Sequence, residues 1–432
     1  MKIANNLYKV ELKKSEEAVT GKIGLGWMAE SMRRFGIKKA VSDEYRGQKG
    51  SNRQKDAYEK IMTGVMMMAS GGQRLEDIEN LRVDRGLLES LGWEEMVCAD
   101  TMINFIGDKR NNAKNRRVND TLMIKTIKQA QEEEFTFDSD ATYLDSDKDS
   151  AEYSYQGVRQ MSGLLGCIAE LGIINTVDYR RGNASPQVGI LNHLKKACQQ
   201  TERAGKRIKR FRSDSAAHQD KIFTYCAKKN IEWYVTLDKN PGVMKTVKKL
   251  KAFDWKTMYG RYEYDYDKQW AVAEHVVNKG YRVRILVLRW KNPDVTLFDK
   301  SPYCYHVIGT NNMDIKPMEW LEVHNGRMGT IEQVHKELKT GFGCDYTPSH
   351  DFEKNRGYFL LGVLAYNMAQ VVKLFYLGTD AVTWTIKTMR YQFINVCGKI
   401  IKSGRQYFCK IINVTHEVFE RFKYCQMKML SA

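Results

Sequence analysis

The spacing of apolar residues changes at Phe135, and this change constrains the fold more than any other feature of the chain. Before it, over about 26–131, apolar residues recur three and four positions apart, as in 58–69 and 75–91, which is typical of amphipathic helices. After it, short apolar runs of strand length are mixed with helical stretches such as 219–229. We therefore predict a helical block followed by an α/β core.

The strand-like runs fall into two groups. The first group consists of FTFDSDATYL, LLGCIAELGII, INTVDY and RIKRFRSD, between Phe135 and Asp214. The second group lies between about Ile231 and Thr310 and consists of IEWYVTL, YGRYEYDYD, WAVAEHVV, YRVRILVLRW and CYHVIGT. We interpret the second group as a separate β-rich insertion, after which helices are expected from about Lys316 to the end of the chain.

A chain of 432 residues is too long for one ordinary compact core, so several domains are expected. We predict five segments: an N-terminal helical domain (1–131), the first part of the α/β core (132–230), the β-rich insertion (231–310), the second part of the core (311–380) and a basic C-terminal helical region (381–432). The basic stretch NNAKNRR (111–117) is expected to be a connector. A packing domain with a solvated basic face is an equally good interpretation of the helical block.

The charge balance points to a polyanionic partner. The 69 lysines and arginines exceed the 52 aspartates and glutamates by 17, and each phosphate that they neutralise releases a counterion. Composition alone leaves DNA, RNA and a membrane surface open. Nine cysteines without a CxxC pair indicate reduced thiols in a cytoplasmic protein. The apolar stretch 357–372 contains Asn367 and Gln370, so we expect a buried helix there and no membrane partner.

Carboxylates follow or end several of the predicted elements. In FTFDSDAT, Phe135 and Phe137 point to one side of a strand, and Asp138, Asp140 and Thr142 point to the other. A strand of this kind can hold carboxylates rigidly at a metal site. A solvated edge strand is the alternative interpretation.

Two further acids occur in comparable places. Asp214 ends the run RIKRFRSD directly before a predicted helix, where Asp is also a favoured N-cap residue. Glu332 lies in RMGTIEQVHKELK, whose buried stripe is predicted to contain Ile331, Val334 and Leu338. Glu332, His335 and Lys339 share a neighbouring face, which is also a common pattern of exposed charge. His335 and His218 are typical of solvated helix histidines.

Taken in order, these segments resemble the DDE transposases of bacterial insertion sequences, and in particular the branch with a β-rich insertion between the second Asp and the Glu. The resemblance runs from about Ala18 to Lys410 and rests on DSDATYLDSDK, YSYQG, RRGNAS, SDSAAHQD, HNGRMGTIEQVHKELK and FEKNRGYFLLGVLAYNMAQ. It implies an RNase H-like mixed sheet flanked by helices. It also implies that 132–230 and 311–380 form the catalytic core and that the helical domain 1–131 binds DNA ends. By position, Asp140, Asp214 and Glu332 match the three catalytic, metal-binding carboxylates, with Asp138 in reserve for the first.

The same family carries a Tyr-Arg-Glu-Lys signature whose basic members hold phosphates of the element's end. Arg327, Glu332 and Lys339 match it, with the family's six residues between Glu and Lys. The chain departs from it in two ways: His324 replaces the Tyr, and four residues instead of three separate Arg327 from Glu332. The resemblance therefore implies DNA contacts by Arg327, Lys339 and His324.

The implied activity is DNA transposition, in which metal-dependent cleavage at transposon ends is followed by strand transfer. Three carboxylates are oxygen-only ligands that suit Mg²⁺ or Mn²⁺, and two ions are expected. The implied partners are double-stranded DNA with inverted-repeat ends and target DNA, bound by a homodimer at the nucleoid of a bacterial cytoplasm. A catalytically silent DNA-binding relative and a metal-dependent nuclease without strand transfer are the alternatives.

Two further groups of residues suit nucleic-acid contacts. The tryptophans of the insertion, Trp255, Trp270 and Trp290, are candidates for shaping the active site around DNA, although buried tryptophans are commoner. Near the C-terminus, basic and aromatic residues interleave: Lys387, Arg390, Tyr391, Phe393, Lys399, Lys402, Arg405, Tyr407, Phe408 and Lys410. The basic outer face of an amphipathic helix explains this second group equally well.

Overall fold

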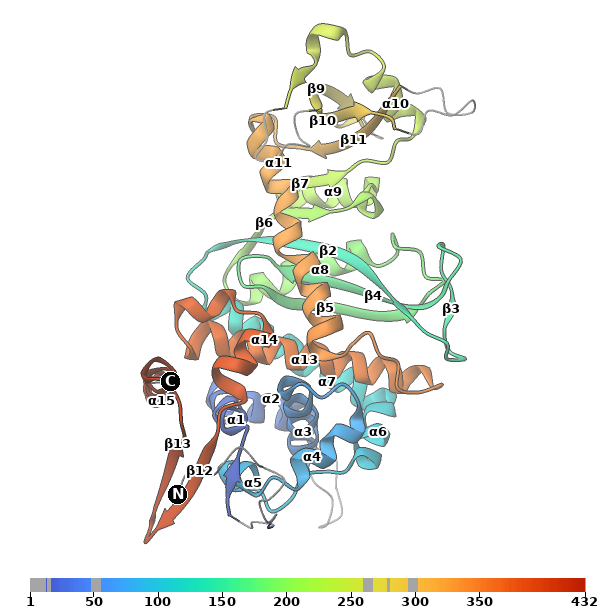
Figure 1. Ribbon diagram of the computed structural model, residues 1–432. Coiled ribbons are helices and arrows are strands. Elements are labelled where there is room, and N and C mark those ends of the chain that lie inside the picture. The colour runs from blue at the N-terminus through green and yellow to red at the C-terminus, as the bar shows by residue number, and fades with distance from the viewer. Residues whose placement is uncertain are drawn as a thin grey trace, which may run out of the picture.

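A computed structural model describes residues 13, 17–47, 56–258, 267–277, 280–293 and 302–431. Figure 1 shows a helical part, a sheet and a β-rich extension that follow one another from the bottom of the view to the top. The predicted helical block is confirmed. Its helices are α1 (Ile23–Phe35), α2 (Ile37–Glu44), α3 (Ala57–Ser70), α4 (Ile78–Arg82), α5 (Arg85–Leu91), α6 (Ala99–Gly107) and α7 (Lys109–Gln129).

The connector expected at 111–117 is wrong, because this stretch lies inside α7. Its three asparagines are buried, and two of them donate to backbone carbonyls. The Asn111 amide donates to the Phe105 carbonyl at 3.0 Å, and the Asn112 amide donates to the Glu353 carbonyl at 3.0 Å. Asparagines that are buried and hydrogen-bonded in this way fix the packing of α7 on its neighbours.

The core is a mixed sheet with helices packed on it, as expected for an RNase H-like fold. Its strands are β2 (Glu134–Asp145), β3 (Glu152–Tyr153), β4 (Arg159–Ile168), β5 (Ile173–Arg181), β6 (Arg207–Ser213) and β7 (Glu232–Thr236). Strand β4 pairs antiparallel with β5, β3 and β2, and β2, β6 and β7 run parallel. The parallel strands are joined through α8 (Ile190–Arg203) and α9 (Asp220–Lys229), which provide the crossovers that parallel pairing requires.

The insertion contributes β8 (Lys256–Thr257), β9 (Gln269–Val276), β10 (Arg282–Lys291) and β11 (Tyr303–Thr310), preceded by α10 (Pro241–Val247). We expected a separate unit, but β11 pairs antiparallel with β7 through 308–310 and 234–236, so these strands extend the core sheet. Strand β7, placed within 231–310, itself pairs with β6. The edge of β7 has free backbone groups, which β11 satisfies. Of the run YGRYEYDYD, 259–266 lie outside the described residues.

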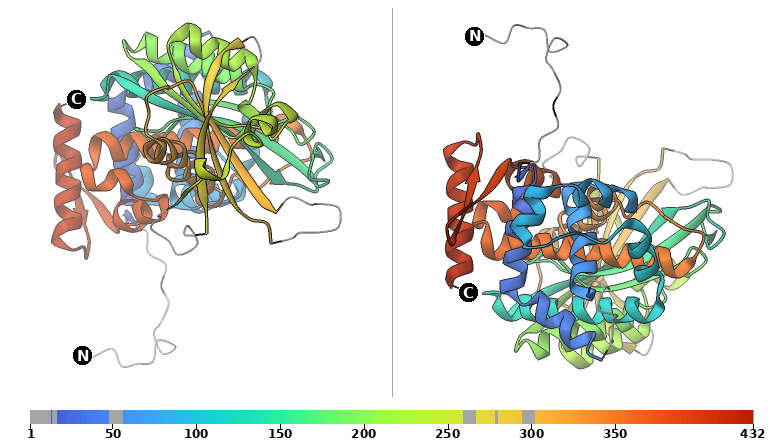
Figure 2. Two further views of the ribbon diagram at one scale, coloured as in Figure 1. Left: turned by 90° about the horizontal axis from the view of Figure 1, so that it is seen from above. Right: turned by 90° about the horizontal axis from the view of Figure 1, so that it is seen from below.

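The C-terminal part contains α11 (Pro317–Asn325), α12 (Ile331–Lys336), α13 (Phe352–Tyr376), α14 (Ile386–Met389) and α15 (His416–Ser431). The entirely helical region expected over 381–432 is wrong, because β12 (Gly398–Ser403) and β13 (Gln406–Ile411) form a hairpin that pairs with β1 (Val19–Thr20). The hairpin turns at Gly404, whose φ of 62° suits glycine. Figure 2 shows the hairpin and α15 at one side of the molecule, beside the N-terminal helices.

The long helix α13 confirms the buried helix expected at 357–372. It begins after Asp351, whose carboxylate accepts the Lys354 N–H at 2.9 Å, and it packs against α3, α6, α7 and β5. Among the described residues, α13 is the one helix long and apolar enough to cross a membrane, and 89% of its apolar window is buried inside the protein.

Near its end, α13 carries a buried lysine whose titration should be measurable. Lys373 is 6% exposed, and its Nζ donates to the Trp384 carbonyl at 2.5 Å. Burial lowers the pKa of Lys373 from 10.5 to about 8, with the Glu337 carboxylate acting in the opposite direction. Because the folded pKa is the lower one, the unfolded chain binds more protons between pH 8 and pH 10.5. Stability therefore rises with pH across this window.

We expect the free energy of unfolding to gain about 2 kcal/mol from Lys373 between pH 7.5 and pH 9.5. Lys373→Met should lack this gain and be more stable than the wild type at pH 7.5, because no charge is then buried. Urea unfolding of both proteins at the two pH values measures the difference. An equal change in stability with pH in both proteins would contradict the assignment.

Candidate active site

The two predicted aspartates occupy matching positions on neighbouring parallel strands: Asp140 lies within β2, and Asp214 directly follows β6. Strands β2 and β6 are paired up to Ser139 and Ser213, and the Ser213 hydroxyl donates to the Ser139 carbonyl at 2.8 Å. Asp140 is the residue after Ser139, and Asp214 is the residue after Ser213. Since paired strands lie about 4.8 Å apart, the two aspartates project from adjacent backbones.

Asp214 combines this position with a capping role. Its Oδ1 accepts the Ala216 N–H at 3.1 Å at the start of the short helix Ser215–Ala217, which directly follows β6. Asp214 is therefore an N-cap residue, and this role is compatible with a place in the candidate site. The cap restrains the carboxylate at the end of the strand.

Glu332 is brought to this end of the sheet by α12, which packs against β2 and β4. The predicted apolar stripe is confirmed: Ile331, Val334 and Leu338 are buried. Glu332 itself is exposed. It lies in the first turn of α12, so its direction depends on how this helix begins.

Asp140 is a largely buried carboxylate whose pKa is influenced by the charges of the other two acids. The side chain is 18% exposed, and burial, the largest influence, raises the pKa of Asp140 to about 7. The negative charges of Asp214 and Glu332 raise it as well, whereas Arg327 and the Ala141 N–H oppose the rise. Carboxylates that repel one another in this way form an environment that favours a cation.

Arg327 and Lys339 both contact β2 near Asp140. Arg327 is largely buried, and its Nη2 donates to Asp140 Oδ2 at 3.1 Å. The Nζ of Lys339 donates to the Tyr143 carbonyl at 2.7 Å, three residues further along the strand. Two of the three predicted phosphate-binding residues therefore lie beside the first carboxylate.

His324 lies in a different environment. Its Nε2 is 3.1 Å from the Thr236 hydroxyl, and its Nδ1 is 3.3 Å from the Asn325 side-chain oxygen. Burial lowers the pKa of His324 to about 3, so the ring is neutral. A neutral, buried ring does not offer a phosphate the positive charge that Arg327 and Lys339 offer.

Asp138 is the reserve candidate for the first metal ligand, and both of its carboxylate oxygens accept hydrogen bonds. Arg212 donates from Nε to Oδ1 and from Nη2 to Oδ2, each at 2.7 Å, and the Thr330 hydroxyl also donates to Oδ2. The Asp138 side chain is fully buried. Sequence reasoning missed Arg212 and Thr330. The available signal was an arginine at the buried end of the strand-like run RIKRFRSD.

The donor set suits a hard cation, because carboxylate oxygens are the ligands that Mg²⁺ and Mn²⁺ prefer. Within the described ranges, no group of three or more His, Cys, Asp or Glu side chains already forms a metal-binding cluster. Asp140 is instead held by Arg327. The residues therefore fit a divalent ion in chemistry and charge, and binding requires the carboxylates to draw together.

The two histidines expected to be solvated are partly buried instead. His218 accepts the Asp238 N–H at 3.0 Å through Nδ1, and its side chain is 12% exposed. The Nε2 of His335 is buried without a hydrogen-bond partner in the described structure, and burial lowers the pKa of His335 to about 3. Both rings pack inward because each faces other elements of the core.

The C-terminal basic residues divide into two kinds. Arg390 is structural: its guanidinium donates to the carbonyls of Met68, Ala69 and Gly341. Lys399, Lys402, Arg405 and Lys410 lie instead on or next to the hairpin strands β12 and β13.

The insertion contains an arginine stacked between two aromatic rings. The Arg289 guanidinium lies 3.8 Å from the ring centre of Trp255 and 4.4 Å from that of Tyr303. Two of the three tryptophans singled out in the sequence thus make cation–π contacts, because the Lys256 Nζ also lies 5.1 Å from the ring centre of Trp270.

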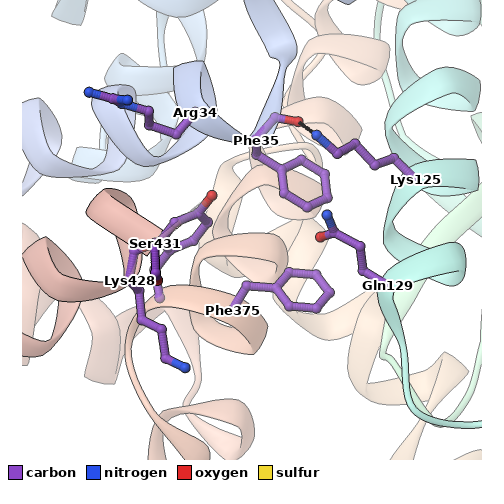
Figure 3. Close-up of a pocket in the computed structure, with 8 residues that line it drawn as sticks. Arg34, Phe35, Lys125, Gln129, Phe375, Lys428 and Ser431 are labelled. Atoms are coloured by element: carbon purple, nitrogen blue, oxygen red, sulfur yellow. Dashed lines mark hydrogen bonds between the residues drawn. The ribbon is translucent and has the colours of Figure 1, made fainter.

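A separate hollow lies between α1, α7, α13 and α15 (Figure 3). Arg34, Lys125 and Lys428 line it, and Lys125 donates to the Phe35 carbonyl at 2.5 Å. Phe35 stacks on Phe375 with ring centres 5.6 Å apart. None of the predicted site residues lines this hollow.

Comparison with known proteins gives three results. No curated protein matches the chain by sequence. Among solved structures, the chain is similar to "Cryo-EM structure of piggyBac transposase synaptic complex with hairpin DNA (SNHP)", with 9% sequence identity and a TM-score of 0.45 over 84% of this chain and 80% of that chain. The family described as transposase DDE domain group 1 matches residues 4–422, a range that includes all three carboxylates.

Proposed function

Since the chain belongs to the transposase DDE domain group 1 family and is therefore a DNA transposase, we propose that Asp140, Asp214 and Glu332 bind its catalytic metal ions. The observation that carries this proposal is the adjacent position of Asp140 and Asp214, each the next residue after the paired Ser139 of β2 and Ser213 of β6. The packing of α12 against β2 and β4, and the influence of the Asp214 and Glu332 charges on the pKa of Asp140, support it. Full engagement of Asp138 by Arg212 and Thr330 favours Asp140 as the ligand from β2.

We propose Mg²⁺ or Mn²⁺ as the ion, and two ions in the working site. When bound, such ions activate the attacking oxygen and neutralise the charge on the leaving one. The protein restrains the carboxylates that hold them: Asp140 is fixed within a paired strand, and Asp214 is fixed by its cap. This restraint reduces the reorganisation that the site needs during the reaction.

We propose that Arg327 and Lys339 bind DNA phosphates next to the scissile bond. Both side chains are held against β2 by single hydrogen bonds, which a phosphate oxygen can replace. If Arg327 bound a DNA phosphate in place of Asp140, the Asp140 carboxylate would be free to bind a cation. His324 is better suited to supporting this region through its contact with Thr236.

We propose as partners double-stranded DNA with inverted-repeat ends and a target DNA, bound by a homodimer. Transposition requires two ends to be processed, and a symmetric pair of subunits supplies two equal sites. The surplus of 17 positive charges supports DNA binding. The N-terminal helices are proposed to recognise the ends. A bacterial insertion sequence, with the protein at the nucleoid of the cytoplasm, remains the proposed setting.

The proposal is tested with purified protein, Mn²⁺, DNA that carries the element's ends and a target plasmid. We expect cleavage at the ends and joined products in the plasmid. Bound but uncut DNA would identify a silent DNA-binding relative, and cut DNA without joined products would identify a nuclease. Either of these results would overturn the assignment of strand transfer to this chain.

A further inference from the structure

Behind the three carboxylates lies a cluster that we call the bracing triad, in which Asp138 and Arg212 are buried and Thr330 is partly buried. It consists of Asp138, Arg212 and Thr330. Each member stands two residues before one of the proposed metal ligands, in the order Asp140, Asp214 and Glu332. The three segments that carry the ligands are therefore joined to one another directly behind the site.

Each member of the bracing triad is hydrogen-bonded to the other two. Arg212 forms the two-pronged ion pair with Asp138 and also donates from Nη2 to the Thr330 hydroxyl at 3.2 Å. Thr330 in turn donates to Asp138. The remaining Nη1 of Arg212 donates to the Val323 carbonyl at 2.7 Å. One guanidinium thus links β2, β6, the end of α11 and the residue that precedes α12.

The backbone around the bracing triad is shaped to admit this guanidinium. A Cβ added at Gly326 would lie 2.3 Å from Arg212 Nη1, so a larger residue would displace the guanidinium from its bond to the Val323 carbonyl. The φ of Gly326 is −55°, which every residue adopts, so the requirement is for space and not for conformation. Glycine at this position is therefore explained by the close approach of Arg212.

The chemistry of the cluster suits positioning better than stabilisation. A buried ion pair contributes little net stability, because the cost of desolvating both charges offsets their attraction. A bidentate guanidinium–carboxylate pair does impose direction on both partners. On strands, residues two apart share a face, so fixing Asp138 and Arg212 fixes the backbone that presents Asp140 and Asp214. Thr330 fixes the beginning of the helix whose first turn presents Glu332.

We propose that Asp138, Arg212 and Thr330 are positioning residues that hold the three metal-binding carboxylates in register. This inference rests on the proposed function of the site. It assigns to Asp138 a role different from that of a ligand, and it assigns roles to Arg212 and Thr330. It also explains why β2 and β6 carry the charged residues Asp138 and Arg212 at buried positions.

The test uses Thr330→Val, which keeps the shape of the side chain and leaves the Asp138–Arg212 pair in place. We expect the rate of DNA cleavage at saturating DNA to fall about 10- to 100-fold, as is typical when a group that orients metal ligands is lost. The Mn²⁺ concentration for half-maximal rate should rise, and the Kd for end DNA should be unchanged. Thr330→Ser restores the hydroxyl and should restore most of the rate.

A matched control is Thr340→Val. It removes an exposed hydroxyl whose one hydrogen bond within the described part of the chain goes to the Lys336 carbonyl, and it should cleave as the wild type does. The double variant Asp138→Leu/Arg212→Met replaces the ion pair with apolar side chains. It should unfold at a similar or higher urea concentration than the wild type and yet cleave poorly.

Two results would overturn the inference. One is a wild-type response of Thr330→Val to Mn²⁺, and the other is a loss of activity that follows the folded fraction and is not restored by Thr330→Ser. Glu332→Gln separates this failure from that of the proposed site. If Glu332→Gln is inactive while Thr330→Val is normal, only the bracing role fails. If Glu332→Gln cleaves normally, the proposed site itself fails.

Discussion

Asp140→Asn is expected to reduce DNA cleavage and strand transfer by roughly three orders of magnitude, because residues that act as one catalytic unit fail together. The amide keeps the size of the side chain but removes the negative charge that a divalent cation requires. DNA binding should persist, since Arg327 and Lys339 are retained. Gel-based cleavage and joining assays with Mn²⁺, together with a DNA-binding titration, measure both effects.

The matched control for this prediction lies two residues away on the same face of the strand. Asp138→Asn should weaken cleavage only about 10- to 100-fold, because Asp138 orients ligands and does not bind the ions. The reverse order, with Asp138→Asn inactive and Asp140→Asn merely slower, would transfer the ligand role to Asp138.

Arg212→Gln is expected to lower the free energy of unfolding by about 3–5 kcal/mol, the usual cost of leaving one buried charge without its partner. The carboxylate of Asp138 has no solvent exposure, so it cannot regain hydration when the guanidinium is lost. Urea unfolding followed by circular dichroism measures the change.

The control for Arg212 is an arginine on the same strand. Arg207 pairs with Glu134 at the surface, where 61% of the arginine side chain is exposed. Arg207→Gln should therefore cost less than about 1 kcal/mol. Equal losses for Arg207→Gln and Arg212→Gln would contradict the buried-pair account.

The sequence predicted the parts of the fold that depend on local periodicity. The alternation around Asp140 identified β2, and the spacing of Ile331, Val334 and Leu338 identified α12. These patterns are local because side chains alternate along a strand and recur every three or four residues along a helix. Family resemblance then placed Asp140, Asp214 and Glu332 in order.

The remaining features depend on contacts between distant residues. Asp138 and Asp140 share a strand face, so contacts from distant residues distinguish their environments. Arg212, 74 residues away, and Thr330 bind Asp138, whereas Arg327 binds Asp140. The asparagines in 111–117 look solvated in sequence but are buried by α13 and neighbouring segments. Strand β11, at the end of the insertion, pairs with β7, and no local sequence pattern predicts that pairing.

The convergence of Asp140, Asp214 and Glu332 on metal ions is tested most directly by anomalous scattering from crystals of the protein grown with Mn²⁺ and end DNA. The account predicts manganese peaks within bonding distance of oxygens from all three carboxylates, with Asp138 still bound to Arg212. Manganese held by other side chains, with any of the three carboxylates outside its coordination sphere, would contradict it.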